Sequence, residues 1–202
     1  ELVQNRNFIF YKVDINQNKK LIKLYKKYHF NYVFHFAAQA GVRYSLINPR
    51  SYIENNISGF FNVLNLSIKF KVKRLFYASS SSVYGISEEK NVTEDHPLVP
   101  LTLYNKYNGL CESLLFKYTD ENFEGVIFRP ATVCGFAPRQ RLDLSVNILT
   151  NHAVNKNKIT VFGGDQLRPN LHVKDYCDAV ELFLEAPSEK IRDEIFNIGY
   201  QN

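Results

Sequence analysis

The sequence has no methionine and no tryptophan, and only three of its 202 residues are cysteines. Cys111, Cys134 and Cys177 are widely spaced and form neither a CxxC pair nor a zinc-ligand pattern, so we expect no metal site. Isolated cysteines in odd number are typical of free, buried thiols in a reducing compartment such as the cytoplasm. Because the chain begins with Glu1 and lacks methionine altogether, we expect it to be a fragment of a longer protein.

Long hydrophobic runs are missing too. The longest, such as residues 32–38, are far too short to span a bilayer, and no basic-then-apolar signal peptide opens the chain. Hydrophobic residues make up 45% of the sequence and charged residues 22%, which is typical of globular and not of disordered chains. We therefore expect a folded protein that has no membrane partner.

The excess of positive charge is small. Lysine and arginine total 25 against 20 acidic residues, and the lysines gather near residues 19–27 and 69–74. Such runs can indicate nucleic-acid binding, but Leu21, Leu24 and Tyr28 recur here at helical spacing, with the lysines largely on the opposite face. We interpret the runs as solvated helix faces and expect no nucleic-acid partner.

Apolar strand patterns alternate with helical patterns over the first two thirds of the chain. We expect strands at residues 8–15, 32–38, 74–80 and 125–129, and helices at residues 19–29, 52–69 and 103–116. This alternation predicts an α/β fold with a doubly wound parallel sheet. Ligands of such sheets bind beyond the carboxyl ends of the strands, where the sequence places Asp14, two alanines and a run of four serines.

The pattern changes near residue 135. A polar loop is followed by a helix at 143–155, a strand at 159–162, a helix at 174–186 and a strand at 194–198. We expect residues 1–135 to form a partial Rossmann-like domain and residues 136–202 to form part of a smaller substrate-binding lobe.

A glycine-rich turn is the absence that matters most for function. A dinucleotide-binding sheet opens with a strand, a GxxGxxG turn and a helix whose N-terminus holds the pyrophosphate. None of the nine glycines forms a GxG or GxxGxxG pattern. We therefore expect the first strands and the glycine turn to precede Glu1.

A serine run and a tyrosine carry the chemistry. Residues 79–85 read Ser-Ser-Ser-Ser-Val-Tyr-Gly, and Tyr104 follows at the start of a predicted helix, 24 residues after Ser80. Serine-rich strand ends are common without any function. A phenol beside a serine hydroxyl at the top of a sheet, however, can exchange a proton with a substrate alcohol.

With these residues, the sequence resembles the extended short-chain dehydrogenases/reductases of the nucleotide-sugar epimerase/dehydratase family, and most of all the UDP-glucuronate 4-epimerases. The resemblance lies in the segment His-Phe-Ala-Ala-Gln-Ala-Gly-Val-Arg-Tyr-Ser at 35–45, in 79–85, and in Arg-Pro-Asn-Leu-His-Val-Lys-Asp at 168–175. It implies a partial Rossmann domain that binds NAD, a nucleotide-sugar substrate, and a homodimer in the full-length protein.

The resemblance also implies roles for single residues. On the cofactor side, Asp14 and Ile15 would contact the adenine end of NAD. The path of the pyrophosphate and ribose would be lined by Ala37, Ala38 and Gln39. Asn56, on the long predicted helix, would lie near the cofactor. On the catalytic side, Ser80 would bind the sugar 4-hydroxyl and Tyr104 would be the acid/base. On the substrate side, Arg168 would pair with the diphosphate, Thr132 and Arg141 would hold the sugar carboxylate, and Ser82 would line the site.

Neutral serines separate the epimerases from their relatives. Nucleotide-sugar 4,6-dehydratases carry acidic residues where this chain has Ser81 and Ser82, and UDP-glucuronate decarboxylases have a glutamate at the Ser82 position. The resemblance thus implies 4-epimerisation by oxidation at C4, rotation of the 4-keto intermediate and return of hydride to its other face.

One position departs from the family pattern. The family has Tyr-x-x-x-Lys with both side chains on one helix face, and here the fourth residue after Tyr104 is Asn108. A phenol without a nearby ammonium is only about one part in a thousand ionised at pH 7. We expect strongly impaired or absent activity. Two alternatives stay open: an epimerase for another UDP- or GDP-sugar, and a catalytically impaired relative that acts as a binding or dimer partner.

Overall fold

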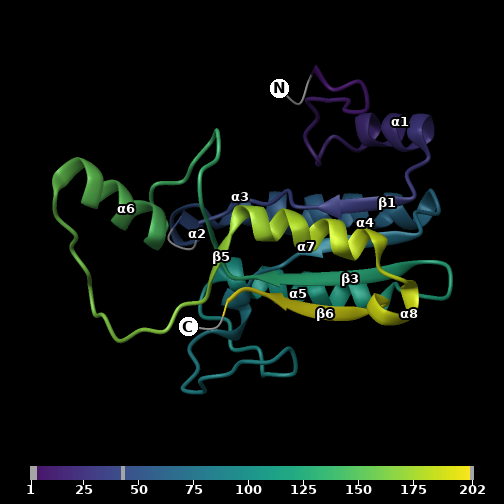
Figure 1. Ribbon diagram of the computed structural model, residues 1–202. Coiled ribbons are helices and arrows are strands. Elements are labelled where there is room, and N and C mark those ends of the chain that lie inside the picture. Colours follow the sequence, from purple (N-terminus) through teal and green to yellow (C-terminus); the bar gives the residue numbers. More distant parts are fainter. Residues whose placement is uncertain (1–3, 42–43, 201–202) are drawn as a thin grey trace.

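The computed structural model describes residues 4–41 and 44–200 of the chain (Figure 1). Its centre is a parallel sheet of four strands in the order β1–β2–β3–β6. These strands are β1 (Tyr32–His35), β2 (Arg74–Ala78), β3 (Glu124–Pro130) and β6 (Glu194–Ile198). A second, two-stranded parallel sheet consists of β4 (Thr132–Cys134) and β5 (Asn170–His172).

Helices cover both faces of the main sheet, which confirms the expected partial Rossmann-like α/β fold. The longer ones are α1 (Asn18–Tyr28), α4 (Gly59–Lys69), α5 (Leu103–Lys117), α6 (Ser145–Lys156) and α7 (Val173–Glu185). The short ones are α2 (Tyr44–Ile47), α3 (Pro49–Tyr52), α8 (Ser188–Ile191), a π-helix (Ile53–Ser58) and a 3₁₀ helix (Ser81–Tyr84).

Alternate residues of β2 serve opposite faces of the sheet. Leu75 and Tyr77 pack in a cluster with Phe60 of α4 and Leu115 of α5, whereas Phe76 packs with α7 and β3 on the other side. Each fully buried aliphatic or aromatic side chain contributes about 1.5–3 kcal/mol. A strand that is apolar on both faces therefore holds helices on both sides, as a parallel sheet requires.

Two buried ion pairs join neighbouring elements. Arg74 of β2 meets Glu124 of β3 at 2.6 Å and also donates to the Ser188 hydroxyl of α8 at 2.9 Å. Arg129 of β3 meets Glu112 of α5 at 2.6 Å. All four charged side chains of these pairs are at most 4% exposed, so each charge depends on its partner for solvation.

Two predicted strands are wrong. Residues 8–14 form no helix or strand and are followed by a turn, and residues 159–162 are irregular. Neither segment has a neighbouring strand among the described residues, and an isolated extended segment gains no ladder hydrogen bonds. The predicted helix at 52–69 is interrupted, because its first turns form the π-helix before α4 begins.

The predicted division at residue 135 stays a prediction, although β6 from the C-terminal part pairs with β3 in the main sheet. The expectation of buried thiols holds for Cys111 and is wrong for Cys177, which is exposed on α7. Within the described ranges, no helix is long and apolar enough to cross a membrane.

Candidate active site

The serine run turns sharply away from the end of β2. The Ser80 side chain caps the 3₁₀ helix by accepting from the Ser82 amide at 3.2 Å, and the two hydroxyls lie 2.8 Å apart. Gly85 ends this helix at φ +76°, and a Cβ there would lie 2.1 Å from the Val99 carbonyl oxygen. Only glycine fits at that position without moving backbone.

The serine end of β2 is hydrogen-bonded to the start of α5. The Ser82 hydroxyl donates to Asn105 Oδ1 at 2.8 Å, and the Thr102 side chain caps α5 by accepting from the Asn105 amide at 3.4 Å. Tyr104 stands directly before Asn105 in this first turn and is half-buried. The structure thus brings Ser80, Ser82 and the turn that carries Tyr104 together, and the link between Ser80 and that turn runs through Ser82 and Asn105.

A second tyrosine supports Tyr104 from the side of β1. The Tyr52 ring meets the Tyr104 ring edge-on, with centroids 6.2 Å apart and an interplanar angle of 80°. The buried Tyr52 hydroxyl donates to the carbonyl oxygens of Ala40 at 3.0 Å and Gly41 at 2.5 Å. Burial raises the pKa of Tyr52, so this phenol stays protonated as a donor. Tyr52 therefore connects the loop after β1 to the catalytic tyrosine proposed from the sequence.

Asn108 lies one helical turn after Tyr104 and is 2% exposed. Its Oδ1 accepts from the Tyr77 hydroxyl at 3.1 Å, and burial raises the pKa of Tyr77 well above the usual value. Its Nδ2 is buried without a hydrogen-bond partner among the described residues. An unsatisfied buried donor costs about 1–3 kcal/mol, so this amide has an unused hydrogen bond to give.

The loop after β1 exposes Ala37 and Ala38 and is clamped at Gln39. Asn56 Oδ1 accepts from the Gln39 amide at 2.7 Å, and Asn56 Nδ2 donates to the Gln39 carbonyl at 3.1 Å. Asn56 belongs to the π-helix, and the Cys111 thiol donates to its carbonyl at 3.3 Å. Both ends of the Asn56 amide are engaged by the loop, so this residue shapes the loop and holds Gln39 in place.

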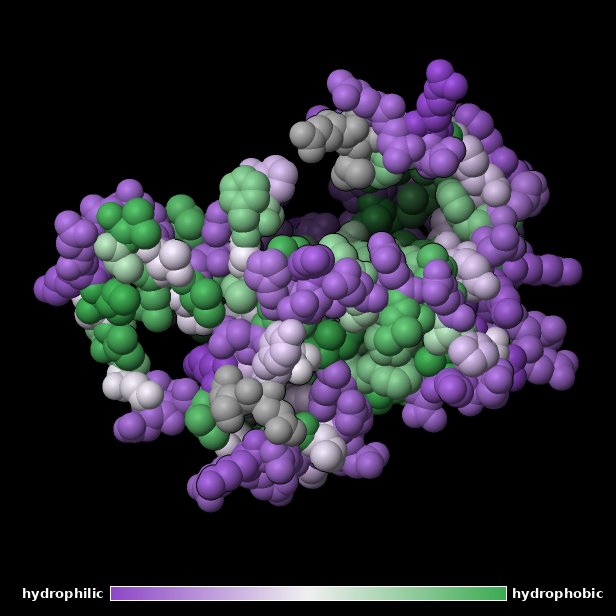
Figure 2. All heavy atoms as spheres, viewed as in Figure 1, coloured by the Kyte–Doolittle hydropathy of each residue, from purple (hydrophilic) through white to green (hydrophobic). Residues whose placement is uncertain are grey.

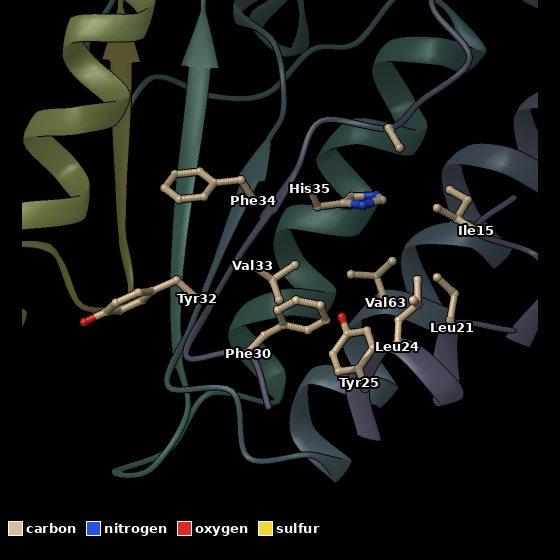
Figure 3. Close-up of a pocket in the computed structure, with 11 residues that line it drawn as sticks. Ile15, Leu21, Leu24, Tyr25, Phe30, Tyr32, Val33, Phe34, His35 and Val63 are labelled. Atoms are coloured by element: carbon tan, nitrogen blue, oxygen red, sulfur yellow. The ribbon is translucent and has the colours of Figure 1, made fainter. Parts of the chain in front are cut away.

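Asp14 and Ile15 lie shortly before α1, and Ile15 lines a groove that β1 also lines. The Asp14 carboxylate accepts from the Asn16 amide at 2.8 Å, and the Ile15 carbonyl accepts from Asn62 of α4 at 3.0 Å. A Cβ on Gly59 would lie 2.4 Å from the end of the Ile15 side chain, so α4 and this turn approach closely. Ile15 lines a groove together with residues of β1 (Figure 3), and Ala37 also lines this groove.

The three residues expected to hold the substrate lie in the C-terminal part. Thr132 is half-buried in β4 opposite Asn170. Arg168 is exposed in the loop before β5, and its carbonyl oxygen accepts from Asn170 Nδ2 at 2.9 Å. Arg141 is ion-paired with Asp143 at 2.6 Å; this pair, with smaller effects from Tyr104 and Tyr52, raises the pKa of Arg141. Arg141 thus lies within electrostatic range of Tyr104.

Sequence reasoning missed a buried polar network behind the serine run. Glu112 accepts from the Ser79 hydroxyl and is paired with Arg129, which also donates to the Tyr84 hydroxyl at 2.7 Å. Tyr84 donates in turn to Asn197 Oδ1 of β6 at 2.7 Å, so the network runs from the serine run to β6. The available signal was a glutamate between the apolar residues Cys111 and Leu115 of the predicted helix. Among the described residues, no group of three or more His, Cys, Asp or Glu could hold a metal ion.

Comparison with curated proteins finds relatives that match most of this chain. The chain is 36% identical over 189 residues to Protein CapI of Staphylococcus aureus, covering 92% of this chain and 56% of the relative. It is 34% identical over 206 residues to a UDP-glucuronate 4-epimerase of Thermodesulfobacterium geofontis, covering 98% and 60% respectively. The chain therefore spans less than two thirds of the length of these relatives.

Solved structures give the same result. A UDP-glucuronic acid 4-epimerase of Bacillus cereus, in complex with UDP-glucuronic acid and NAD, superposes with a TM-score of 0.85 at 29% identity, over 100% of this chain and 63% of that one. A UDP-glucose 4-epimerase of Thermotoga maritima with UDP-glucose gives a TM-score of 0.83 at 29% identity, over 98% and 64%.

A family model described as the NAD dependent epimerase/dehydratase family matches residues 2–199. Together with the relatives and the superpositions, this match confirms the resemblance inferred from the serine run and the arginine motif. Because it spans nearly all of the 202 residues, the chain belongs to the NAD dependent epimerase/dehydratase family.

Proposed function

We propose that this protein catalyses the NAD-dependent 4-epimerisation of a nucleotide sugar resembling UDP-glucuronate, through a 4-keto intermediate. The observation that carries the proposal is the hydrogen-bonded bridge from Ser80 through Ser82 to Asn105. This bridge holds the turn that carries Tyr104 against the serine end of β2. A 4-epimerase needs a proton acceptor and a neutral hydrogen-bonding group on the same substrate hydroxyl, and this is the pair that the bridge supports.

The side chains divide the task as follows. Tyr104 takes the proton of the sugar 4-hydroxyl and returns it after the 4-keto intermediate has rotated. Ser80 hydrogen-bonds the same hydroxyl and orients it. Ser82 has no charge and is hydrogen-bonded on both sides, so it cannot act as the carboxylate base that elimination or decarboxylation chemistry would use. This difference supports epimerisation over dehydration.

The residues around the loop after β1 fit NAD, on which the family depends. When bound, NAD would accept a hydride from the sugar C4 and return it. The short side chains of Ala37 and Ala38 let a ligand approach the backbone, and Asn56 holds Gln39 beside them. The unpartnered Asn108 Nδ2 can donate to a ribose hydroxyl. Asp14 and Ile15 would contact the adenine end.

The proposed substrate contacts are a diphosphate on Arg168 and a carboxylate on Thr132 and Arg141. A guanidinium suits both anions because it binds them in bidentate fashion. The Arg141–Asp143 pair is exposed and exchanges readily with a substrate carboxylate, since exposed ion pairs contribute only about 0–1 kcal/mol. A UDP-sugar without a carboxylate is the first alternative substrate.

Asn108 supports a second candidate function. Without an ammonium near Tyr104, the protein could serve as a catalytically impaired relative that binds a nucleotide sugar or forms a homodimer. The buried Asn108 amide, which has no charge, is the observation that favours this candidate.

The test measures conversion of UDP-glucuronate to its 4-epimer by the full-length protein with NAD, beside UDP-glucose and a GDP-hexose. Tyr104→Phe and Ser80→Ala are each expected to lower turnover by at least roughly a hundredfold. Tyr107→Phe, on the same helix, is the matched control and should leave turnover unchanged. Full activity of Tyr104→Phe would refute the proposed mechanism. No conversion of any sugar, even by Asn108→Lys, would favour the second candidate.

A further inference from the structure

Tyr77 is a buried tyrosine to which the proposed reaction gives no task. It lies on β2 and is 4% exposed. Its ring packs beside His35 of β1, with centroids 5.9 Å apart, and beside Phe60 of α4, with centroids 4.9 Å apart. Because β2 has a strand on each side, the ring is fixed to the interior of the sheet. The core therefore sets the position of the Tyr77 hydroxyl, and no surface loop does.

The surroundings of this hydroxyl are apolar. Tyr77 shares a cluster with Leu64, Leu115 and Ile127. On the side of β1, His35 lines the groove described above, and Figure 2 shows hydrophobic residues at the bottom of a hollow below the N-terminal part of the chain. Burial raises the pKa of Tyr77 well above its usual value, so the phenol stays protonated. A buried hydroxyl needs an acceptor for its proton, because an unmet buried donor destabilises the fold.

That acceptor is the side-chain amide of Asn108. The Tyr77 hydroxyl donates to Asn108 Oδ1 at 3.1 Å. The oxygen and the nitrogen of an amide lie on opposite sides of one planar group, so a bond that holds Oδ1 also fixes the direction of Nδ2. Nδ2 is itself buried and has no hydrogen-bond partner among the described residues. The amide is thus held by its oxygen and keeps its two N–H donors free.

The polar groups next to Asn108 on α5 are already engaged. The Cys111 thiol donates to a backbone carbonyl of the π-helix at 3.3 Å. Glu112, one turn further along the helix, accepts from the Ser79 hydroxyl and is paired with Arg129. These bonds leave the Asn108 nitrogen to an acceptor that a ligand brings.

We propose that Tyr77 is a positioning residue, which fixes the Asn108 amide so that its nitrogen donates to a ribose hydroxyl of NAD. The inference rests on the NAD site of the proposed function. Tyr77 does not touch the cofactor and acts only through Asn108. In this arrangement a neutral amide supplies a cofactor contact without supplying a charge to Tyr104. Cofactor binding is then retained at a site whose proton transfer lacks an ammonium.

The experiment is calorimetric titration of NAD into the full-length protein after removal of bound nucleotide. Tyr77→Phe deletes the hydroxyl and keeps the ring, and Asn108→Ala deletes the amide. Each should weaken NAD binding by roughly tenfold, as the loss of one hydrogen bond does. The double variant should bind NAD no more weakly than either single variant, because Tyr77 acts through Asn108. If Tyr77 only supported the packing, its replacement would lower the affinity in both backgrounds and the losses would add.

Two further variants complete the set. Asn108→Asp offers Tyr77 the same acceptor but has no N–H donor, so it should weaken NAD binding at least as much as Asn108→Ala. Tyr107→Phe, which removes a hydroxyl from the same helix, is the matched control and should bind NAD like the wild type. Urea unfolding of each variant establishes that it is folded.

The outcomes separate this inference from the proposed function. An unchanged NAD affinity in Tyr77→Phe or Asn108→Asp, or additive losses in the double variant, would overturn the role of Tyr77 alone. A wild type that binds no NAD would overturn both proposals. The expected pattern of NAD affinities in a protein that converts no sugar would support the role of Tyr77 and refute epimerisation.

Discussion

Replacing Asn108 with lysine tests whether a missing ammonium limits this site. Asn108 is 2% exposed, lies one turn after Tyr104 and has one buried donor without a partner. Residues four apart on a helix have Cβ atoms about 5–6 Å apart, so a lysine can place its ammonium near the Tyr104 oxygen. The substitution places a positive charge where the Asn108 amide now has a donor without a partner.

The expected gain follows from the distance. A unit charge about 6 Å from a phenolate, at an effective dielectric constant of about 20, stabilises it by about 3 kcal/mol. That energy corresponds to roughly a hundredfold in turnover at pH 7. Burying the ammonium costs stability, and we expect the free energy of unfolding to fall by about 1–3 kcal/mol. The Tyr77 hydroxyl, now bonded to Asn108, can accept from the new ammonium and reduces that cost.

The assay compares kcat of the full-length wild type and Asn108→Lys on UDP-glucuronate between about pH 6 and pH 9. The ascending limb of the pH profile is expected to move to lower pH in the variant. Asn108→Gln is the matched control, since it keeps the amide and adds no charge. A lysine variant with unchanged kcat and an unchanged pH profile would refute the reasoning. A glutamine variant that gains as much as the lysine variant would show that charge is not the cause.

Three further predictions concern stability and cofactor binding. Glu112→Gln leaves the buried Arg129 charge without its carboxylate and should cost about 3–5 kcal/mol in urea unfolding, whereas Glu121→Gln at an exposed position should cost little. Burial lowers the pKa of His35 to about 4, below its usual 6.5, so the native state binds fewer protons than the unfolded state. Stability should therefore fall by about 2–3 kcal/mol as the pH drops from 7 to about 4.5, and His35→Gln should lose that part of the decrease; an equal decrease in both proteins would contradict the assignment. Calorimetry of the 202-residue chain should detect no NAD binding in the micromolar range. A micromolar affinity would contradict this, because it would show that the groove lined by Ile15 and Ala37 binds NAD without further residues.

Elements that are buried in the sheet could be predicted from sequence. β2 and β3 each contain an apolar run, at residues 75–78 and 126–128, and helices α5 and α7 have apolar residues that pack on the sheet. The segments at 8–15 and 159–162 have the same local character, but a strand exists only where another strand supplies its hydrogen bonds. That information is not local, so composition and alternation could not exclude these two.

In the candidate site, too, some features could be predicted from the sequence and others could not. The sequence could place Ser80 at the carboxyl edge of the sheet because Ser80 follows β2, and it could place Tyr104 in the first turn of α5. The clamp between Asn56 and Gln39 could not, because it depends on a π-helix that shifts Asn56 relative to a regular helix. The Glu112–Arg129 pair joins a helix to a strand, and neither residue alone indicates the other.

The groove beside β1 and the proposed cofactor site depend on the same residues. Ile15 and Ala37 line the groove, so whatever fills it sets the distance between the proposed adenine contacts and the loop held by Asn56. The part of the site proposed for proton transfer does not depend on the groove. Hydrogen bonds within the described residues join Ser80 to Ser82 and Ser82 to Asn105, and Glu112 accepts from Ser79. A segment placed in the groove is therefore expected to change cofactor affinity without altering the serine–tyrosine geometry.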